Sequence, residues 1–254
     1  MNTALYILTK SVPAGSVGVF WLGQAGFVFK THSGKLIAVD PYLSDNVGRT
    51  GSFKRIVPSV LGCEELNFDY IVATHEHPDH LDPDAIPLLM TNNFTRLLAA
   101  KQAALDAHEK LGVASGRIVS MVPGDSFEDD SFTVLALPCD HGDSSPTAIG
   151  LLLQFGRKRV YIAGDTCPRP DIFSDERIRG CDLAIFPING AFGNLNEHEA
   201  AQAARIVGAK LTVPSHFWCL AEHGGNPALF AKAMDAAPDS PAYYIMSNGE
   251  AIII

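Results

Sequence analysis

Residues 73–82 read ATHEHPDHLD, and the fold of the whole chain is inferred from this stretch. It contains three histidines and an aspartate within six positions: His75, His77, Asp79 and His80. Imidazole nitrogens and carboxylate oxygens at this density are typical ligands of zinc, manganese or iron. Side chains two apart on an extended backbone point the same way, so His75 and His77 can share one ion. Asp79 and His80 follow a proline bend and can turn toward a second ion. The pattern therefore predicts a metal site rather than a surface loop that happens to be rich in histidine.

The composition indicates a well-filled core and an acidic surface. The 254 residues are 47% hydrophobic, and 28 aspartates and glutamates outnumber 19 lysines and arginines, which gives a net charge of −9. Proteins that bind nucleic acid through its phosphates normally carry basic patches. We therefore expect no nucleic acid as a partner, and a small polar or anionic molecule as the substrate.

Targeting signals and disulfides are not expected from this sequence. The first ten residues contain one short apolar stretch and no basic leader, which predicts neither a secretory signal nor a membrane anchor. The five cysteines are an odd number without the spacing of a disulfide framework. We expect a cytoplasmic protein with free thiols and no membrane partner, and a homo-oligomer is compatible with the sequence.

The apolar runs predict two similar halves. The first forty residues are expected to be strand and turn, with a β-meander over residues 17–39, followed by alternating strands and helices. A second meander is expected to begin near residue 131, again followed by strands and helices, one of which opens with a capping box at residues 196–199 and stops at Gly208. We predict one domain, residues 1–254, with halves of about 1–125 and 126–254. The predicted fold class is α/β (α+β four-layer), with two packed mixed sheets and helices on the outer faces.

Several polar residues come directly after predicted strands, where ligands collect in α/β folds: Asp40, His75, His141, Asp165, Asn189 and His216. If these strand ends converge, His75, His77 and His141 can hold one ion, and Asp79, His80 and His216 a second. Asp165 is suited to bridge both, since a carboxylate has two oxygens. Two such cations, about 3.5–4 Å apart, would share a water or hydroxide. Asp40 is expected to brace the histidine loop through hydrogen bonds.

The order of these residues resembles the metallo-β-lactamase superfamily: His-x-His-x-Asp-His at residues 75–80, then His141, the Gly-Asp-Thr at residues 164–166, and His216. Residues 21–27 (WLGQAGF), 39–45 (VDPYLSD) and 189–200 look like the ascorbate-6-phosphate lactonase branch. The resemblance implies an αββα sandwich, a divalent metal (Mn²⁺ or Zn²⁺, one or two ions) and hydrolysis of a sugar-acid lactone.

The leading hypothesis is a metal-dependent hydrolase that uses a metal-bridging hydroxide to open a lactone of a sugar acid or sugar-acid phosphate, or a related small ester. Asp79 is the expected catalytic residue, because it can orient the bridging water or take its proton. Asn189 and His223 are the expected substrate-binding residues. The leaving alkoxide would be protonated by a metal-bound water or by His223. The loop with Arg49, Lys54 and Arg55 would either hold an anionic substrate or carry solvated charges.

Two other functions are compatible with the same residues. One is a phosphodiesterase, either a nuclease or a phospholipid hydrolase, with the same two ions; the other is a metal-binding protein without turnover. Cys139, Cys167 and Cys219 lie near proposed ligands but are expected to be small packing residues. The remaining histidines are expected to be structural: His32, His108 and His198.

Overall fold

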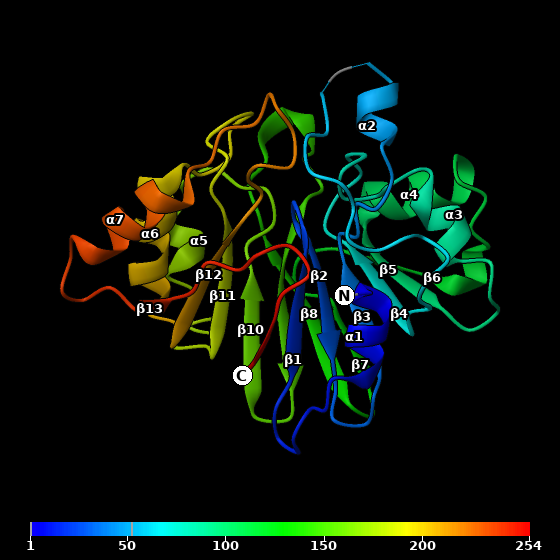
Figure 1. Ribbon diagram of the computed structural model, residues 1–254, viewed down its shortest axis with the longest axis horizontal. Coiled ribbons are helices and arrows are strands. Elements are labelled where there is room, and N and C mark those ends of the chain that lie inside the picture. Colours follow the sequence, from blue (N-terminus) through cyan, green and yellow to red (C-terminus); the bar gives the residue numbers. More distant parts are fainter. Residues whose placement is uncertain (1, 52) are drawn as a thin grey trace.

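Two seven-stranded sheets form the centre of the protein in the computed structural model, which describes residues 2–51 and 53–254 (Figure 1). The first sheet has the order β14-β1-β2-β3-β4-β5-β6, and the second has the order β13-β12-β11-β10-β9-β8-β7. The strands of the first are β1 (Gly18–Gly23), β2 (Gly26–Lys30), β3 (Leu36–Val39), β4 (Tyr70–Ala73), β5 (Arg96–Ala100), β6 (Ile118–Met121) and β14 (Ala251–Ile253). Those of the second are β7 (Ser126–Asp129), β8 (Phe132–Pro138), β9 (Ile149–Phe155), β10 (Lys158–Ile162), β11 (Leu183–Pro187), β12 (Leu211–Ser215) and β13 (Ala242–Tyr243).

Both sheets are mixed, and in both the strand pairing changes from antiparallel to parallel partway across the sheet. In the first sheet β1 to β3 pair antiparallel, whereas β3 to β6 pair parallel. In the second sheet β7 to β10 pair antiparallel and β10 to β13 pair parallel. The last strand, β14, returns to the first sheet and pairs with β1, so the sheets do not follow the predicted division into halves at this point.

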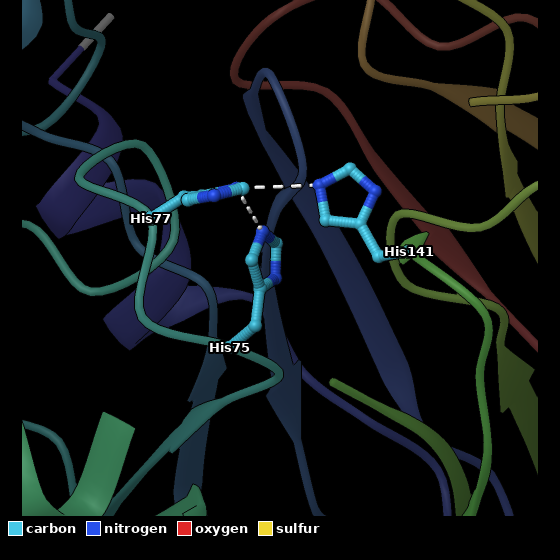
Figure 2. A group of neighbouring side chains, drawn as sticks. All are labelled: His75, His77 and His141. Atoms are coloured by element: carbon cyan, nitrogen blue, oxygen red, sulfur yellow. Dashed lines mark hydrogen bonds between the residues drawn. The ribbon is translucent and has the colours of Figure 1, made fainter. Parts of the chain in front are cut away.

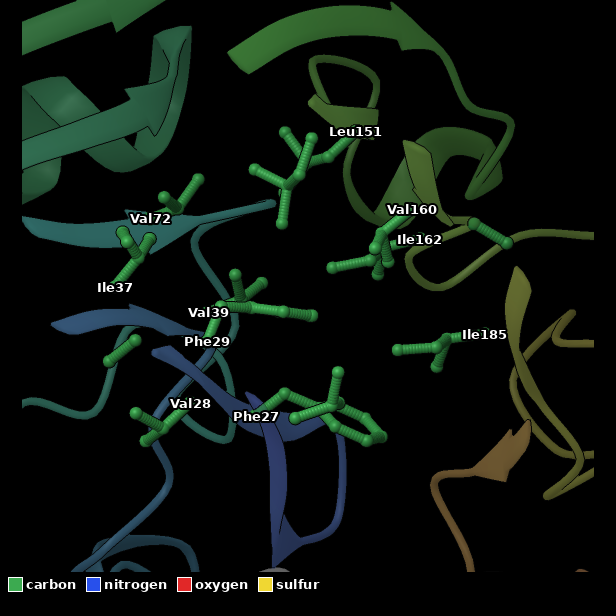
Figure 3. Packing of buried hydrophobic residues seen from close by; sticks show 14 of the residues in the cluster. Phe27, Val28, Phe29, Ile37, Val39, Val72, Leu151, Val160, Ile162 and Ile185 are labelled. Atoms are coloured by element: carbon green, nitrogen blue, oxygen red, sulfur yellow. The ribbon is translucent and has the colours of Figure 1, made fainter. Parts of the chain in front are cut away.

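The core lies between the sheets. Every residue of β1, β2 and β3 is buried, and so are the apolar residues of the facing strands β9, β10 and β11. Phe29 of β2 stacks on Phe155 of β9 with ring centroids 5.9 Å apart, which joins the two sheets directly. Figure 3 shows side chains of the first sheet, such as Phe27 and Val39, facing those of the second, such as Leu151 and Ile185. Strands covered on both faces are apolar along their whole length, and burial of this area supplies the main drive for folding.

Helices cover the outer faces. On one side lie α3 (Ala85–Leu89) and α4 (Lys101–Glu109), and on the other α5 (Pro170–Phe173), α6 (Glu197–Val207) and α7 (Pro227–Asp235) (Figure 1). The predicted capping box is present: Asn196 accepts from the backbone N–H of Glu199, whose side chain accepts from the Asn196 N–H. The predicted αββα sandwich is thereby confirmed. Among the residues described here, no helix is long and apolar enough to cross a bilayer.

Two boundaries were predicted wrongly. Residues 3–9 form a helix, α1 (Thr3–Thr9), where only strand and turn were expected. The end of this helix is stabilised by β2, because the buried Lys30 donates to the carbonyls of Ile7, Leu8 and Lys10. This contact is distant in the chain, so the sequence of residues 3–9 gives no indication of it. The second meander begins at β7, five residues earlier than residue 131, because a polar strand at the sheet edge has no clear apolar alternation.

Candidate metal centre

The histidine loop follows β4 and is tightly folded. The backbone N–H groups of His80 and Leu81 both donate to the carbonyl of His77, at 2.9 and 2.8 Å. Asp40, at the end of the neighbouring β3, accepts from the Thr74 N–H at 2.8 Å and from the Thr74 hydroxyl at 2.6 Å. His80 Nδ1 lies 2.8 Å from the same carboxylate, so its Nε2 is directed away from Asp40 and toward the other ligands. Asp40 therefore forms hydrogen bonds with Thr74 and His80 of this loop.

Three imidazoles form the first group of candidate ligands. His77 Nδ1 lies 2.9 Å from His75 Nε2 and 3.2 Å from His141 Nε2 (Figure 2). His75 and His77 come from the loop after β4, and His141 from the exit of β8 in the other sheet. The ligand atoms of this group all lie within 4.8 Å of one another. Nitrogen atoms that face each other at these distances suit a shared cation.

The second group combines Asp79 and His80 with His216, which follows β12. His216 Nε2 lies 3.3 Å from both Asp79 Oδ2 and His80 Nε2. Asp165 lies between the two groups: its Oδ2 is 3.2 Å from His216 Nε2 and 3.9 Å from His141 Nε2. Its Oδ1 is 3.5 Å from His80 Nε2. The structure thus brings all seven predicted ligands to one point.

The charges in this cluster oppose the effect of burial. Burial alone lowers the pKa of His216, but the adjacent Asp165 and Asp79 raise it to about 9. Burial likewise opposes ionisation of Asp165, yet His216 and His80 hold the pKa of that carboxyl well below its usual range. The pKa of His75, where burial dominates, is lowered well below its usual value. The carboxylates therefore stay ionised and require positive charge beside them.

The donor set fits divalent cations. Asp165 Oδ1 is buried without a hydrogen-bond partner in the described part of the chain, and four of the candidate ligands, His75, His80, Asp165 and His216, are at most 5% exposed. Buried charge of this kind is normally paired or bound to metal. Imidazole and carboxylate ligands suit zinc and manganese alike. Sulfur is not among the candidate ligands found within residues 2–51 and 53–254, and Cys139 Sγ instead donates to the Asp165 carbonyl at 3.0 Å.

Two carboxamides support the carboxylates and were missed as site residues. Gln24, in the turn between β1 and β2, donates from Nε2 to Asp79 Oδ2 at 2.8 Å. Asn194, in the loop before α6, donates from Nδ2 to Asp165 Oδ2 at 2.7 Å. Both residues lie in stretches that resemble the lactonase branch, but an amide in a turn is normally a turn former. Only the fold reveals which carboxylate each one touches.

Several residues around the centre hold a left-handed backbone conformation that side chains normally avoid. The φ angle is +46° at Asp40, +51° at Gln24, +60° at His216 and +56° at Phe192. Each costs about 1–3 kcal/mol and persists only where surrounding contacts enforce it. Such strain concentrates at functional sites, and here it accompanies the residues that support the ligands and line the cavity.

A cavity of about 430 Å³ opens beside the ligands. Its walls include Val47, Thr50, Phe53, His77, Asp79, His141, Asp165, Asn189, Phe192, Asn194, His216 and His223. Asn189 is only 2% exposed, and both polar atoms of its side chain lack partners among the described residues. The rings of Phe53, Phe192 and His223 lie within 5.5 Å of one another, centroid to centroid, on one wall. Burial, reinforced by His216, lowers the pKa of His223 to about 4, so its imidazole is neutral at pH 7.

The charged side chains of the basic loop do not line this cavity, although Val47, Thr50 and Phe53 of the same loop do. Arg55 donates to the carbonyls of Tyr42 and Ser44 and lies over the Tyr42 ring. Arg49 pairs with Asp84. Within the described residues, the cavity wall includes no lysine or arginine. The histidines outside the centre are structural or exposed: His32 and His108 bond backbone carbonyls through Nδ1, and His198 is exposed on α6.

Comparison with known proteins agrees with this geometry. A family described as "Beta-lactamase superfamily domain" matches residues 36–217, more than half of the chain. The chain belongs to the metallo-β-lactamase superfamily. A metal-dependent hydrolase of Ligilactobacillus salivarius is 30% identical over 211 residues, which cover 78% of this chain and 84% of that protein. A metal-dependent hydrolase of Hyperthermus butylicus is 28% identical over 201 residues, covering 78% and 82%.

The fold of this metallo-β-lactamase protein also matches solved structures. Igni18, a metallo hydrolase from Ignicoccus hospitalis, superposes with a TM-score of 0.74 at 21% identity, over 94% of this chain and 98% of that chain. Taken with the family match, the relatives identify the chain as a metal-dependent hydrolase with a candidate histidine and aspartate metal site.

Proposed function

We propose that this protein hydrolyses a small lactone, such as that of a sugar acid, or a related carboxylic ester, with Zn²⁺ or Mn²⁺ held by the seven ligands. The observation that carries the proposal is the lining of the cavity beside those ligands. It combines an unpartnered carboxamide, Asn189, with the rings of Phe53 and Phe192, and no lysine or arginine is found there among the described residues. A neutral ester with hydroxyl groups and an apolar edge complements such a wall.

The ions and the side chains have separate tasks in this proposal. Bound divalent cations lower the pKa of water and polarise the ester carbonyl. Asp79, held by Gln24, is directed at the same point and is suited to orient the attacking water and accept its proton. Asn194 fixes one oxygen of Asp165 and leaves the other free for a ligand role. Asn189 has a free N–H and a free carbonyl with which to bind substrate hydroxyl groups.

The absence of lysine and arginine from the described part of the wall favours an unphosphorylated lactone over its phosphate or over a phosphodiester. The cavity volume of about 430 Å³ suits a small molecule rather than a nucleic acid or a membrane. All five cysteines are free thiols, as we expect for an enzyme of the reducing cytoplasm.

The test is a substrate panel with zinc- and manganese-loaded protein. It contains sugar-acid lactones, their phosphates, lactones with alkyl or aryl substituents, and bis-nitrophenyl phosphate. We expect turnover of unphosphorylated lactones that falls about 10²-fold in His77→Ala. His198→Ala makes the same change on an exposed helix and should keep full activity. Turnover of the diester alone would replace the proposal with a phosphodiesterase, and no turnover of any compound would favour a metal-binding protein.

A further inference from the structure

We propose that Gln24 is a positioning residue for His223: it holds that imidazole in the tautomer with the proton on Nε2, so that Nε2 donates a hydrogen bond to the carbonyl oxygen of the substrate. The inference rests on the proposed function for its substrate, and on the contacts of Gln24 for its geometry. It gives His223 the task of a neutral hydrogen-bond donor in place of a proton source.

The orientation of the Gln24 amide is fixed by Asp79. Gln24 is 1% exposed, and its Nε2 lies 2.8 Å from Asp79 Oδ2. The reversed amide would direct Oε1 at a carboxylate oxygen, and two acceptors at that distance repel each other. Nε2 must therefore face Asp79, and this assignment follows from the hydrogen-bond network. The backbone supports the placement, because the Gln24 carbonyl accepts from the His216 N–H at 2.9 Å and from Trp21 Nε1 at 3.1 Å.

The second N–H of Gln24 has one suitable acceptor among the described residues. His223 Nδ1 lies 3.2 Å from Nε2. The ring of His216 is also near, but its two nitrogens lie at 3.2 and 3.4 Å, so Nε2 approaches the ring between them instead of along one lone pair. His216 Nε2 is moreover directed at Asp79 and Asp165 as a candidate ligand. The remaining hydrogen is thus donated to His223 Nδ1, which must be unprotonated to accept it.

The ring of His223 is fixed on its other sides as well. It stacks on His216 with an interplanar angle of 13° and centroids 5.0 Å apart. Phe53 meets it edge-on at 5.3 Å, and Phe192 lies at 5.5 Å. His223 Nε2 has no partner in residues 2–51 and 53–254, and the ring lines the cavity. With the proton on Nε2, the N–H is available to an oxygen of a bound ester, close to the ligands that hold the metal.

This arrangement defines what His223 contributes. A fixed N–H donor stabilises the negative charge that develops on a carbonyl oxygen without transferring its proton. The bond strengthens as charge develops, so its loss should lower kcat with little change in KM. The proton for the departing alkoxide then has to come from another group, such as the proton that Asp79 receives from water.

The tautomer is measured by NMR of the histidine ring nitrogens and carbons in zinc-loaded, isotope-labelled protein. His32 and His108 are internal references for the opposite form, because each donates from Nδ1 to a carbonyl, at 2.7 and 2.9 Å. We expect His223 to give the Nε2–H pattern, and Gln24→Met to produce a mixture of the two forms. A His223 pattern that matches His32 and His108, or one unchanged by Gln24→Met, overturns the proposal. The wild-type spectrum alone decides the tautomer if the variant does not fold, and neither measurement depends on turnover.

A double-mutant cycle tests the link to catalysis. His223→Gln provides an amide N–H near the position of imidazole Nε2 without any tautomer to control, whereas His223→Phe provides none. We expect His223→Phe to lower kcat about 10²-fold, the usual loss for one donor to a developing oxyanion. Gln24→Met should lower kcat more in the wild-type background than in His223→Gln, where only its contact with Asp79 is lost. An equal loss in both backgrounds means that Gln24 acts through Asp79 alone and contradicts the proposal. If wild-type protein opens no lactone, the proposed function fails, while the NMR result on the tautomer stands.

Discussion

The two sheets contribute to the candidate metal centre in different ways. Four candidate ligands come from one loop of the first sheet, residues 75–80, which is closed by its own backbone hydrogen bonds and braced by Asp40 from the adjacent strand. The second sheet provides three candidate ligands from three separate strand exits: His141 after β8, Asp165 after β10 and His216 after β12. Its ligands depend on contacts that cross between loops, such as Asn194 to Asp165 and the His216 N–H to the Gln24 carbonyl.

One side of the candidate centre is therefore organised mainly within its own sheet, whereas the other depends on contacts between the sheets. The loop of residues 75–80 is braced by Asp40 of the same sheet, and Glu76 adds one contact to Ser145 of the second half at 2.9 Å. His216, after β12, is held instead by the β1–β2 turn of the other sheet, through the Gln24 carbonyl. We therefore expect substitutions on the two sides to have different consequences.

The largest effect is expected for Asp165, the residue between the two groups. Asp165→Asn keeps the side-chain size but removes the charge that His80 and His216 face. We expect metal content below one equivalent and a loss of kcat of about 10³-fold or more, because both ions lose a ligand. Elemental analysis after gel filtration measures the metal. Retention of two equivalents would contradict a bridging role for Asp165.

Substitution of a single ligand in one group should release only the ion of that group. We expect His77→Ala and His216→Ala each to keep one tight equivalent, with kcat lowered about 10²-fold. Isothermal titration with Zn²⁺ counts the sites in each variant, and His198→Ala serves as a control for loss of an exposed histidine. If both variants lose the same ion, the division into two groups is wrong.

Much of this arrangement follows from the sequence, and its limits have physical causes. The loop ligands were predicted because their spacing is contiguous, and His141, Asp165 and His216 because strands end directly before them. Helix α1 was missed because its stability depends on Lys30 in β2, 20 or more residues away. Gln24, Asn194, Phe53 and Phe192 have no motif of their own, since amides and aromatic residues in loops gain meaning only from neighbours that are distant in the chain.

Substitution of Asp40 or Asn194, which support the candidate ligands, should have a moderate effect that again differs between the two sides. Asp40→Asn tolerates the left-handed backbone but loses the charge-assisted contact with His80. Asn194→Ala removes the donor to Asp165. We expect both to weaken metal binding by about 10–100-fold while the ligands stay in place. Only Asp40→Asn should also lower the melting temperature of the metal-free protein, because its carboxylate bonds three groups of the loop. Equal melting temperatures would contradict the local organisation of the first side.

A contact between the halves away from the centre should have the smallest effect. Asp129 of β7 binds Lys35 and accepts from the Tyr70 hydroxyl at 2.7 Å, which links the two sheets. Burial opposes its ionisation, but hydrogen bonds, including those from Lys35 and Tyr70, lower the pKa of Asp129. A lowered pKa in the folded state stabilises the protein above pH 4 and loses this effect as the pH falls further.

We expect Asp129→Asn to lower the free energy of unfolding by about 1 kcal/mol at pH 7, and the difference from wild type to shrink steadily as the pH falls below 4. Urea unfolding with EDTA in both samples isolates the effect from metal binding. A difference that grows as the pH falls would have the wrong sign and would refute the ion pair as its origin.

We expect loops from both sheets to hold two divalent cations jointly. Anomalous diffraction at the zinc edge from zinc-loaded crystals would locate these ions. We expect two peaks, one among His75, His77 and His141 and one among Asp79, His80 and His216, with Asp165 in contact with both. Peaks bound to residues of one sheet only, or no peak at this point, would contradict this expectation.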